Sequence, residues 1–340
     1  NDAGLNFAAS TVRGNLAATA TTGNMTDSGA LTVAGTTTLT TSANNATIAL
    51  DTTTNAFTGA VTITTNDDSG TDADVTIDGG TTALILAAST IDGDLTLTSG
   101  HASGITDSGT VTVGGNLAAT TDDNNGVINL GTLAVDGTVA LTTNGSGNAT
   151  VVNDAGLNFA ASTVRGNLAA TATTGNMTDS GALTITGTSS FTTSANNATI
   201  ALDTTTNAFT GAVTITTNDD SGTDADVTID GGTTALVLAA STIDGDLTVR
   251  SGNASGIADN EGTVTVGGNL VATTDANNGV INLTALAVNG TIAVVTNGAG
   301  GATVVNDAGL NLAASTVGGN LLATATTGNI SDSGNLTIAG

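Results

Sequence analysis

Two acidic segments are the first place where this sequence could do chemistry. Asn66 to Asp74 reads NDDSGTDAD, and the same nine letters return from Asn218 to Asp226. Closely spaced carboxylates supply the hard oxygen ligands that Ca²⁺ prefers. The spacing matches neither an EF-hand loop nor the glycine-rich nonapeptide of calcium-binding β-rolls. Calcium at these Asp-rich turns therefore stays open beside a solvated acidic turn, and we assign no metal ligand.

The residues that usually carry catalysis are few and scattered. His101 is the sole histidine, and the second copy of its SGHASG context has Asn253 in its place. The chain has no Cys and no Lys, and its three arginines, Arg13, Arg165 and Arg250, lie far apart in sequence. A polysaccharide-active β-helix enzyme, the alternative from another class, would need Asp, Lys and Arg gathered in one cleft. We therefore predict no catalytic and no cofactor-binding residue, no small-molecule substrate, and a chain that is not an enzyme.

Composition excludes further classes of protein. The 340 residues include 29 acidic and 3 basic ones, for a net charge of −26, and only five aromatic residues, all Phe. Nucleic-acid binders need basic patches and stacking aromatics, so we expect no nucleic-acid partner. No run of 18 apolar residues occurs, which predicts no membrane-spanning segment. Abundant Thr, Val, Ile and Gly, with no Pro, favour an all-β chain with many turns.

The chain repeats itself at long range. The words NDAGLNFAASTVRGNLAATATTGNMTDSGALT open at Asn1, return at Asn153 and return with a few changes at Asn306. The copies are therefore offset by 152 and then 153 residues. We predict long repeats over 1–152, 153–305 and, in part, 306–340, within one continuous solenoid over 1–340. Because the chain begins and stops inside a repeat, we expect it to be an excerpt of a longer protein.

A shorter pattern lies inside the long repeat: an apolar residue, any residue, a glycine, any residue, and a second apolar residue. The corner glycines are Gly14, Gly35, Gly59, Gly93, Gly115, Gly137, Gly166, Gly187, Gly211, Gly245, Gly268, Gly290, Gly319 and Gly340. The residue two places earlier is always apolar: Val12, Val33, Phe57, Ile91, Val113, Val135, Val164, Ile185, Phe209, Ile243, Val266, Val288, Val317 and Ile338. Alternation of period two on both sides predicts half-buried strands. We expect these apolar residues to form one continuous buried column and the glycines to permit sharp turns.

Three short strands in about 22 residues describe one coil of a parallel β-solenoid. The glycine spacings predict about 13 coils of 21–34 residues. A single coil buries too little apolar surface to offset its loss of conformational entropy, so each coil depends on its neighbours. The fold class is therefore all-β.

Threonines form a second series five residues after the corner glycines. Its members are Thr19, Thr40, Thr64, Thr98, Thr120, Thr142, Thr171, Thr192 and Thr216, and Arg250 and Val295 interrupt it later. High β-propensity explains such a series. An ice-binding face would also need Thr two residues earlier, where Ala17, Ala118 and Ala140 stand instead.

The repeats LTVAGTTTLTT, VTVGGNLAATT and LAVDGTVALTT resemble the shafts of filamentous haemagglutinin-like bacterial adhesins. The resemblance covers the whole chain and implies a right-handed β-helix in a secreted or cell-surface protein. It implies a non-enzymatic structural shaft of an extracellular fibre or biofilm adhesin, with other copies of itself or host or matrix surfaces as partners. A self-assembling filament or sheath subunit is the alternative in the same class.

Overall fold

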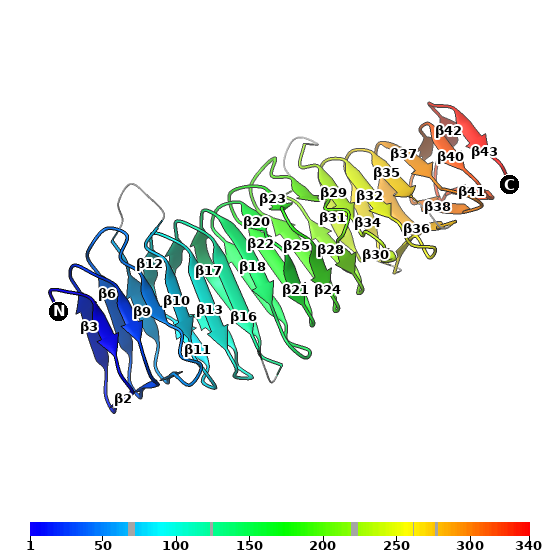
Figure 1. The fold of residues 1–340 in the computed structure, drawn as a ribbon. Coiled ribbons are helices and arrows are strands. Elements are labelled where there is room, and N and C mark those ends of the chain that lie inside the picture. Colours follow the sequence, from blue (N-terminus) through cyan, green and yellow to red (C-terminus); the bar gives the residue numbers. More distant parts are fainter. Residues whose placement is uncertain (67–71, 123–124, 219–223, 261, 276–277) are drawn as a thin grey trace. The chain divides into compact units, whose positions relative to one another are not determined.

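The computed structural model describes residues 1–66, 72–122, 125–218, 224–260, 262–275 and 278–340. They form two compact units, Asn1–Asn167 and Leu168–Gly340. Within each unit, strands of successive turns lie side by side and parallel (Figure 1). The chain is an all-β parallel β-solenoid of about 15 turns, and its described residues contain no helix. Accordingly, no helix that could cross a membrane occurs in the described part of the chain.

The strands of the first unit are β1 (Leu5–Phe7), β2 (Ser10–Val12), β3 (Leu16–Ala20), β4 (Met25–Asp27), β5 (Leu31–Val33), β6 (Thr37–Thr41), β7 (Ile48–Leu50), β8 (Ala56–Phe57), β9 (Val61–Thr64), β10 (Val75–Asp78), β11 (Leu84–Leu86), β12 (Ser89–Ile91), β13 (Leu95–Ser99), β14 (Ile105–Asp107), β15 (Val111–Val113), β16 (Leu117–Thr121), β17 (Ile128–Val135), β18 (Thr138–Thr142), β19 (Ala149–Asn153), β20 (Leu157–Phe159) and β21 (Ser162–Val164).

Those of the second unit are β22 (Leu168–Ala172), β23 (Met177–Asp179), β24 (Leu183–Ile185), β25 (Ser189–Thr193), β26 (Ile200–Leu202), β27 (Ala208–Phe209), β28 (Val213–Thr216), β29 (Val227–Asp230), β30 (Leu236–Leu238), β31 (Ser241–Ile243), β32 (Leu247–Ser251), β33 (Ile257–Asp259), β34 (Val264–Val266), β35 (Leu270–Thr274), β36 (Ile281–Val288), β37 (Thr291–Val295), β38 (Ala302–Asn306), β39 (Leu310–Leu312), β40 (Ser315–Val317), β41 (Leu321–Ala325), β42 (Ile330–Asp332) and β43 (Leu336–Ile338).

The first unit has three faces. Face 1 stacks β1, β4, β7, β10, β13, β16 and β18. Face 2 is short and stacks β2, β5 and β8. Face 3 stacks β3, β6 and β9, then the pairs β11 with β12 and β14 with β15, then β17 and β19. Strands β1 to β19 thus make seven turns of about 22 residues each.

A buried apolar column runs through every turn of face 1 because side chains alternate inward and outward along each strand. In register, its members are Leu5, Met25, Ile48, Val75, Leu95, Leu117 and Val139. All but Leu5 are at most 1% exposed. The second unit repeats the arrangement with Met177, Ile200, Val227, Leu247, Leu270 and Ile292. The core therefore lies along the solenoid interior, as the alternation predicts.

The prediction of one continuous column two residues before the corner glycines is wrong. Phe57 and Phe209 are fully buried as expected. However, Val12, Val33 and Phe57 stack on face 2. Their counterparts Ile91, Val113 and Val135 stack on face 3. The column changes face because the stretch from Gly59 to Gly93 holds β9, β10, β11 and β12, which is more than one turn.

The same fact corrects the number of turns. Because the glycine intervals of 34 and of 29 residues each exceed one turn, counting one coil per interval gives about 13, whereas the structure has about 15 turns. Ile338, the last member of the predicted column, is 38% exposed. In the described residues, its strand β43 has a parallel neighbour on one side only, β40.

Candidate functional site

A ladder of Asp and Asn side chains follows the corner that precedes face 1. Asp74 Oδ1 accepts the main-chain N–H of Asp94 at 2.9 Å, and Asp94 Oδ1 accepts that of Asn116 at 2.7 Å. Asn116 Oδ1 then accepts the N–H of Thr138 at 2.9 Å. In the second unit Asp226, Asp246 and Asn269 form the same ladder, with distances of 2.8, 2.6 and 2.9 Å. Each side chain thus satisfies a main-chain donor of the next turn.

This ladder explains why glycine stands at the face 1 corners Gly93 and Gly115. The chain bends at these corners as expected, but none of the corner glycines has a left-handed φ, so backbone conformation alone does not require glycine there. A Cβ at Gly93 would lie 2.4 Å from Asp74 Oδ1, and one at Gly115 would lie 2.2 Å from Asp94 Oδ1. At these two corners a larger residue would clash with the polar side chain of the preceding turn.

Buried hydroxyls lie at the far end of the strands that follow the corner glycines. They lie six residues after most corner glycines and are at most 5% exposed: Thr41, Thr65, Ser99, Thr121, Thr143, Thr193, Thr217, Ser251, Thr274 and Thr296. Thr41 Oγ1 donates to the carbonyl of Ala46 at 3.1 Å, and Thr121 Oγ1 donates to that of Gly126 at 2.9 Å. In the sequence, the second Thr of most LTT-like words marks this series, but no expectation drawn from the sequence covers it.

Buried asparagines hold the places where the strand arrangement changes. Asn153 Oδ1 accepts the N–H of Val135 at 2.8 Å, and its Nδ2 donates to the carbonyls of Val135 at 3.0 Å and Gly156 at 2.6 Å. Asn306 makes the equivalent bonds in the second unit. The register between β17 and β19 shifts just before Asn153. The amide therefore replaces main-chain pairing that the shift interrupts.

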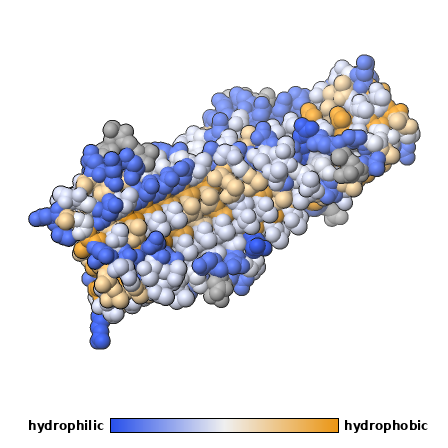
Figure 2. Space-filling model, viewed as in Figure 1, coloured by the Kyte–Doolittle hydropathy of each residue, from blue (hydrophilic) through white to orange (hydrophobic). Residues whose placement is uncertain are grey.

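The threonine series forms separate outward ladders on different faces. Thr19, Thr40 and Thr64 are in register on face 3, and Thr98, Thr120 and Thr142 are in register on face 1. Between the two sets, Thr64 pairs with Thr90. Thr171, Thr192 and Thr216 stack in the second unit. Figure 2 shows the near-white and tan surface of such Thr- and Ala-rich strands, bordered by polar turns in blue.

An acidic column lies at the ends of the face 1 strands. In the first unit it comprises Asp27, Asp51, Asp78 and Asp122. Burial raises the pKa of Asp78 above its usual value, and the three neighbouring carboxylates raise it further, although a bond from the N–H of Gly80 opposes this. The surroundings of the Asp78 carboxyl therefore favour its protonated, uncharged form over the carboxylate.

The equivalent column of the second unit contains a cation. Arg250 stands where the first unit has Thr98. Its Nη2 donates to Asp275 Oδ1 at 2.7 Å, and its Nε lies 4.0 Å from Asp230 Oδ2. Burial still raises the pKa of Asp230, and Arg250 offsets part of that rise. Asp275 in turn raises the pKa of the Arg250 guanidinium.

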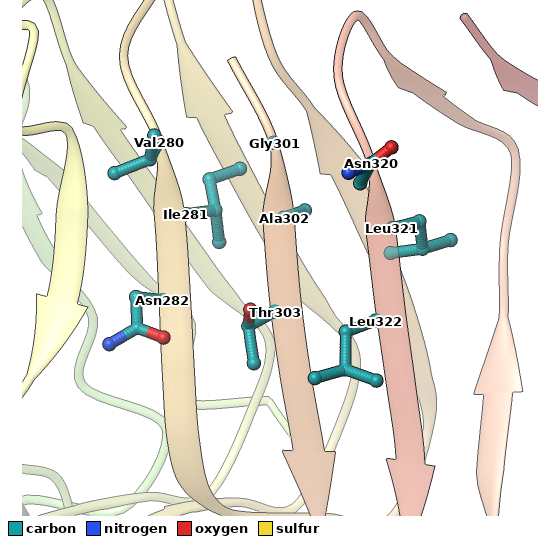
Figure 3. A pocket seen from close by; sticks show the side chains of 9 residues that line it. All are labelled: Val280, Ile281, Asn282, Gly301, Ala302, Thr303, Asn320, Leu321 and Leu322. Carbon is teal, nitrogen blue, oxygen red and sulfur yellow. The ribbon is translucent and has the colours of Figure 1, made fainter. Parts of the chain in front are cut away.

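A shallow hollow of about 470 Å³ lies on the outward side of β36, β38 and β41 in the second unit. Figure 3 shows Val280 and Asn282 on one strand, Leu322 on another, and Thr303 on the strand between them. Val280 is 41% and Leu322 is 59% exposed. The corresponding residue of the preceding repeat is Ala169, so the apolar margin at Leu322 belongs to this turn alone.

The residues that the sequence singles out have two different locations. His101 and Asn253 lie in a structural turn, and most of each Asp-rich segment lies outside the described residues. Nδ1 of His101 accepts the N–H of Ser103 at 3.0 Å, and Oδ1 of Asn253 accepts that of Ser255 at 2.8 Å, so both residues stabilise the same turn. Of the two Asp-rich segments, residues 67–71 and 219–223 lie outside the described part of the chain. Elsewhere, the described residues hold no group of three or more His, Cys, Asp or Glu side chains that could bind a metal.

Comparison with known families identifies the repeats. A family model described as repeats of unknown function (DUF5649) matches residues 1–64, 72–128, 146–216 and 299–340, which is more than half of the chain. No curated protein and no solved structure matches the chain. The matched segments coincide with stacked turns of both units. The chain therefore belongs to the family of repeats of unknown function (DUF5649).

Proposed function

We propose that the chain is a non-enzymatic structural shaft, part of a secreted or cell-surface fibre that holds an adhesive or matrix-forming part away from a bacterium. The observation that carries the proposal is the unbroken stacking of turns within a unit. The same inward column passes through all seven turns of β1 to β19, and each turn hydrogen-bonds to the next. Adding turns extends such a unit without changing its cross-section, which is the property that a spacer needs.

The Asp and Asn ladders at the corners support the same proposal. They join successive turns by side-chain bonds as well as by main-chain pairing. Acidic residues on the turns also give the chain a net charge of −26, which favours solubility and keeps separate shafts apart. The resemblance to haemagglutinin-like adhesins supports the extracellular location.

Duplication of a long repeat tests the spacer role. In a variant that contains residues 1–152 twice, seven added turns at about 4.8 Å each should increase the largest dimension by about 34 Å in small-angle X-ray scattering. The cross-sectional radius of gyration should not change. An increase in cross-section without the gain in length, or degradation of polysaccharides by the purified chain, would contradict the proposal.

A further inference from the structure

The chain contains five Asn-Gly pairs, which begin at Asn125, Asn144, Asn278, Asn289 and Asn297. At such a pair the main-chain nitrogen of the glycine can attack Cγ of the asparagine, because the glycine has no Cβ that hinders the approach. The attack needs this nitrogen to be released from bonds to other turns and to lie close to Cγ. The structure therefore separates the five pairs by their expected reactivity.

Two of the pairs are held by the turn that follows them. Oδ1 of Asn125 accepts the N–H of Ser146 at 2.8 Å, and Oδ1 of Asn278 accepts that of Ala299 at 2.7 Å. In both pairs the glycine is buried, although the asparagine is exposed. The contacts between turns must open before the glycine nitrogen can reach Cγ, so we expect both pairs to react slowly.

The pair at Asn289 is protected through its glycine. The N–H of Gly290 donates to the carbonyl of Gly268, in the preceding turn, at 2.9 Å. In the first unit Asp136 occupies the position of Asn289, and both residues are exposed. An aspartate is therefore compatible with this corner, which makes Asn289→Asp a neutral control.

The pair at Asn144 has the opposite arrangement. Asn144 and Gly145 are both exposed, and Gly145 has a left-handed φ of 61°. The N–H of Gly145 donates to Oδ1 of Asn144 itself at 2.6 Å. Because Oδ1 is bonded to Cγ, the glycine nitrogen already lies beside the carbon that it must attack. Placing two reacting groups together in this way removes much of the entropic cost of the reaction.

Asn297 is the equivalent residue of the second unit. It and Gly298 are exposed, and Gly298 has a left-handed φ of 63°. Each of the two asparagines also makes one bond to the preceding turn. Nδ2 of Asn144 donates to the main-chain carbonyl of Asp122 at 2.7 Å, and Nδ2 of Asn297 donates to that of Asp275. The same exposed turn therefore recurs in both units.

We propose that Asn144 and Asn297 are modification sites, at which the folded chain converts asparagine to aspartate or isoaspartate with water as the co-reactant. The bond between the glycine nitrogen and Cγ forms, the bond between Cγ and Nδ2 breaks, and Nδ2 leaves as ammonia with the proton of the glycine N–H. Water then opens the cyclic imide at one of its two carbonyl carbons. Each event adds one negative charge to the chain.

The modification also changes a contact between turns. A carboxylate cannot donate to the carbonyl of Asp122, so the side-chain bond from Asn144 is lost. Because Asn144 follows Asp122 in the stack, the new charge extends the acidic column of the first unit by one turn. Like charges on neighbouring turns repel each other, so the turn that contains Asn144 should open more readily.

Mass spectrometry of the full chain, aged at neutral pH, tests the proposal. Ageing in water labelled with a heavy oxygen isotope marks only the asparagines that react in the folded protein, and not those that react during digestion. Conversion at Asn144 and Asn297 should be at least about tenfold faster than at the other three pairs, which must first open locally. Equal rates at all five pairs, or no conversion at Asn144 and Asn297, would overturn the proposal.

Ageing of the same chain in urea is the control for sequence. All five pairs should then react at similar rates, because each keeps its two residues and loses its contacts. If the preference for Asn144 and Asn297 persisted in urea, the fold would not be its cause and the proposal would be wrong.

Hydrogen exchange tests the consequence for the turn. Asn144→Asp should speed exchange over residues 144–147, whereas Asn289→Asp should leave the exchange around its corner unchanged. Circular dichroism will establish that both variants fold. Equal effects of the two substitutions would refute the loss of the bond to Asp122 as the outcome of the modification.

Discussion

At the scale of single residues, the interior of each unit contains some polar groups with hydrogen-bond partners and others without them. Most have partners, as Thr41 and Asn153 do. Thr37 and Ser189 are exceptions: they occupy equivalent inward positions, are at most 1% exposed, and leave Oγ without a partner. In both copies they stand where the sequence pattern otherwise has an apolar residue. The sequence thus predicts that these positions face inward but not whether their hydroxyls find partners.

Replacing the unpaired hydroxyls should stabilise the protein. We expect Thr37→Val to raise the free energy of unfolding by about 1 to 2 kcal/mol, because an unsatisfied buried hydroxyl is removed with little change in shape. Ser189→Ala should act in the same direction in the second unit. Thr38→Val, at an exposed position, is the control in thermal unfolding. A loss of stability in Thr37→Val would mean that its hydroxyl has a partner.

Removing a buried asparagine should have the opposite effect. Asn153→Leu leaves three main-chain groups of Val135 and Gly156 without partners. At about 1 to 3 kcal/mol for each such group, the loss should be at least about 3 kcal/mol. Hydrogen exchange should show the loss first at Val135. Asn129→Leu, on the exposed side of β17, should change little, and equal effects would contradict the assigned role.

The raised pKa of Asp78 predicts a pH dependence. Folding strengthens proton binding at this carboxyl, so its favourable contribution is present below the unfolded pKa and is lost as pH rises through the raised folded pKa. Asp78→Asn does not titrate and can still accept the N–H of Gly80. Its Tm should exceed that of the wild type at neutral pH and lose this advantage at acidic pH below the unfolded value. Asp136→Asn controls for removal of a surface charge, and identical profiles for the two variants would refute the prediction.

At the scale of strands and turns, the glycine motif predicts where a corner lies along the chain, but not which faces of the solenoid meet there. The alternation around Gly59 and Gly93 is alike, and both glycines lie against atoms of the preceding turn. Yet the strand before Gly59 belongs to face 2 and the strand before Gly93 to face 3. Both corners require a small residue, so the sequences around them are alike. The local pattern therefore predicts the strands and their burial correctly at both corners. Only pairing over the whole interval determines the face.

The two acidic columns offer a matched exchange between equivalent strands. Arg250→Thr removes the contact with Asp275, and Thr98→Arg places a guanidinium on β13, in register with Asp78 of β10. Because Arg250 is half exposed, each change should alter the free energy of unfolding by less than about 1 kcal/mol. Arg250→Thr should lower this free energy, and Thr98→Arg should raise it. Both effects should vanish in about 1 M NaCl, where the Debye length is about 3 Å. Differences in Tm that persist at high salt would point to packing rather than charge.

At the scale of the whole molecule, the long repeat is a structural unit of seven turns. Its 152 residues restore both the sequence and the face arrangement, so β29 pairs with β32 as β10 pairs with β13. The sequence therefore reveals the period, the strands and the solenoid class. It does not reveal the interlocking ladders, because these depend on which residues of different turns come together.

Cysteine cross-linking tests the pairing most directly, since the chain has no native Cys. Adjacent parallel strands lie about 4.8 Å apart, within the Cα separation that a disulfide spans. The pairs Thr38→Cys with Thr62→Cys and Thr96→Cys with Ala118→Cys join residues in register on face 3 and on face 1. Thr62→Cys with Thr96→Cys joins residues that the glycine spacing aligns but that lie on different faces. We predict rapid disulfide formation within one molecule for the first two pairs and none for the third, and efficient cross-linking of the third would contradict the change of face on which this fold rests.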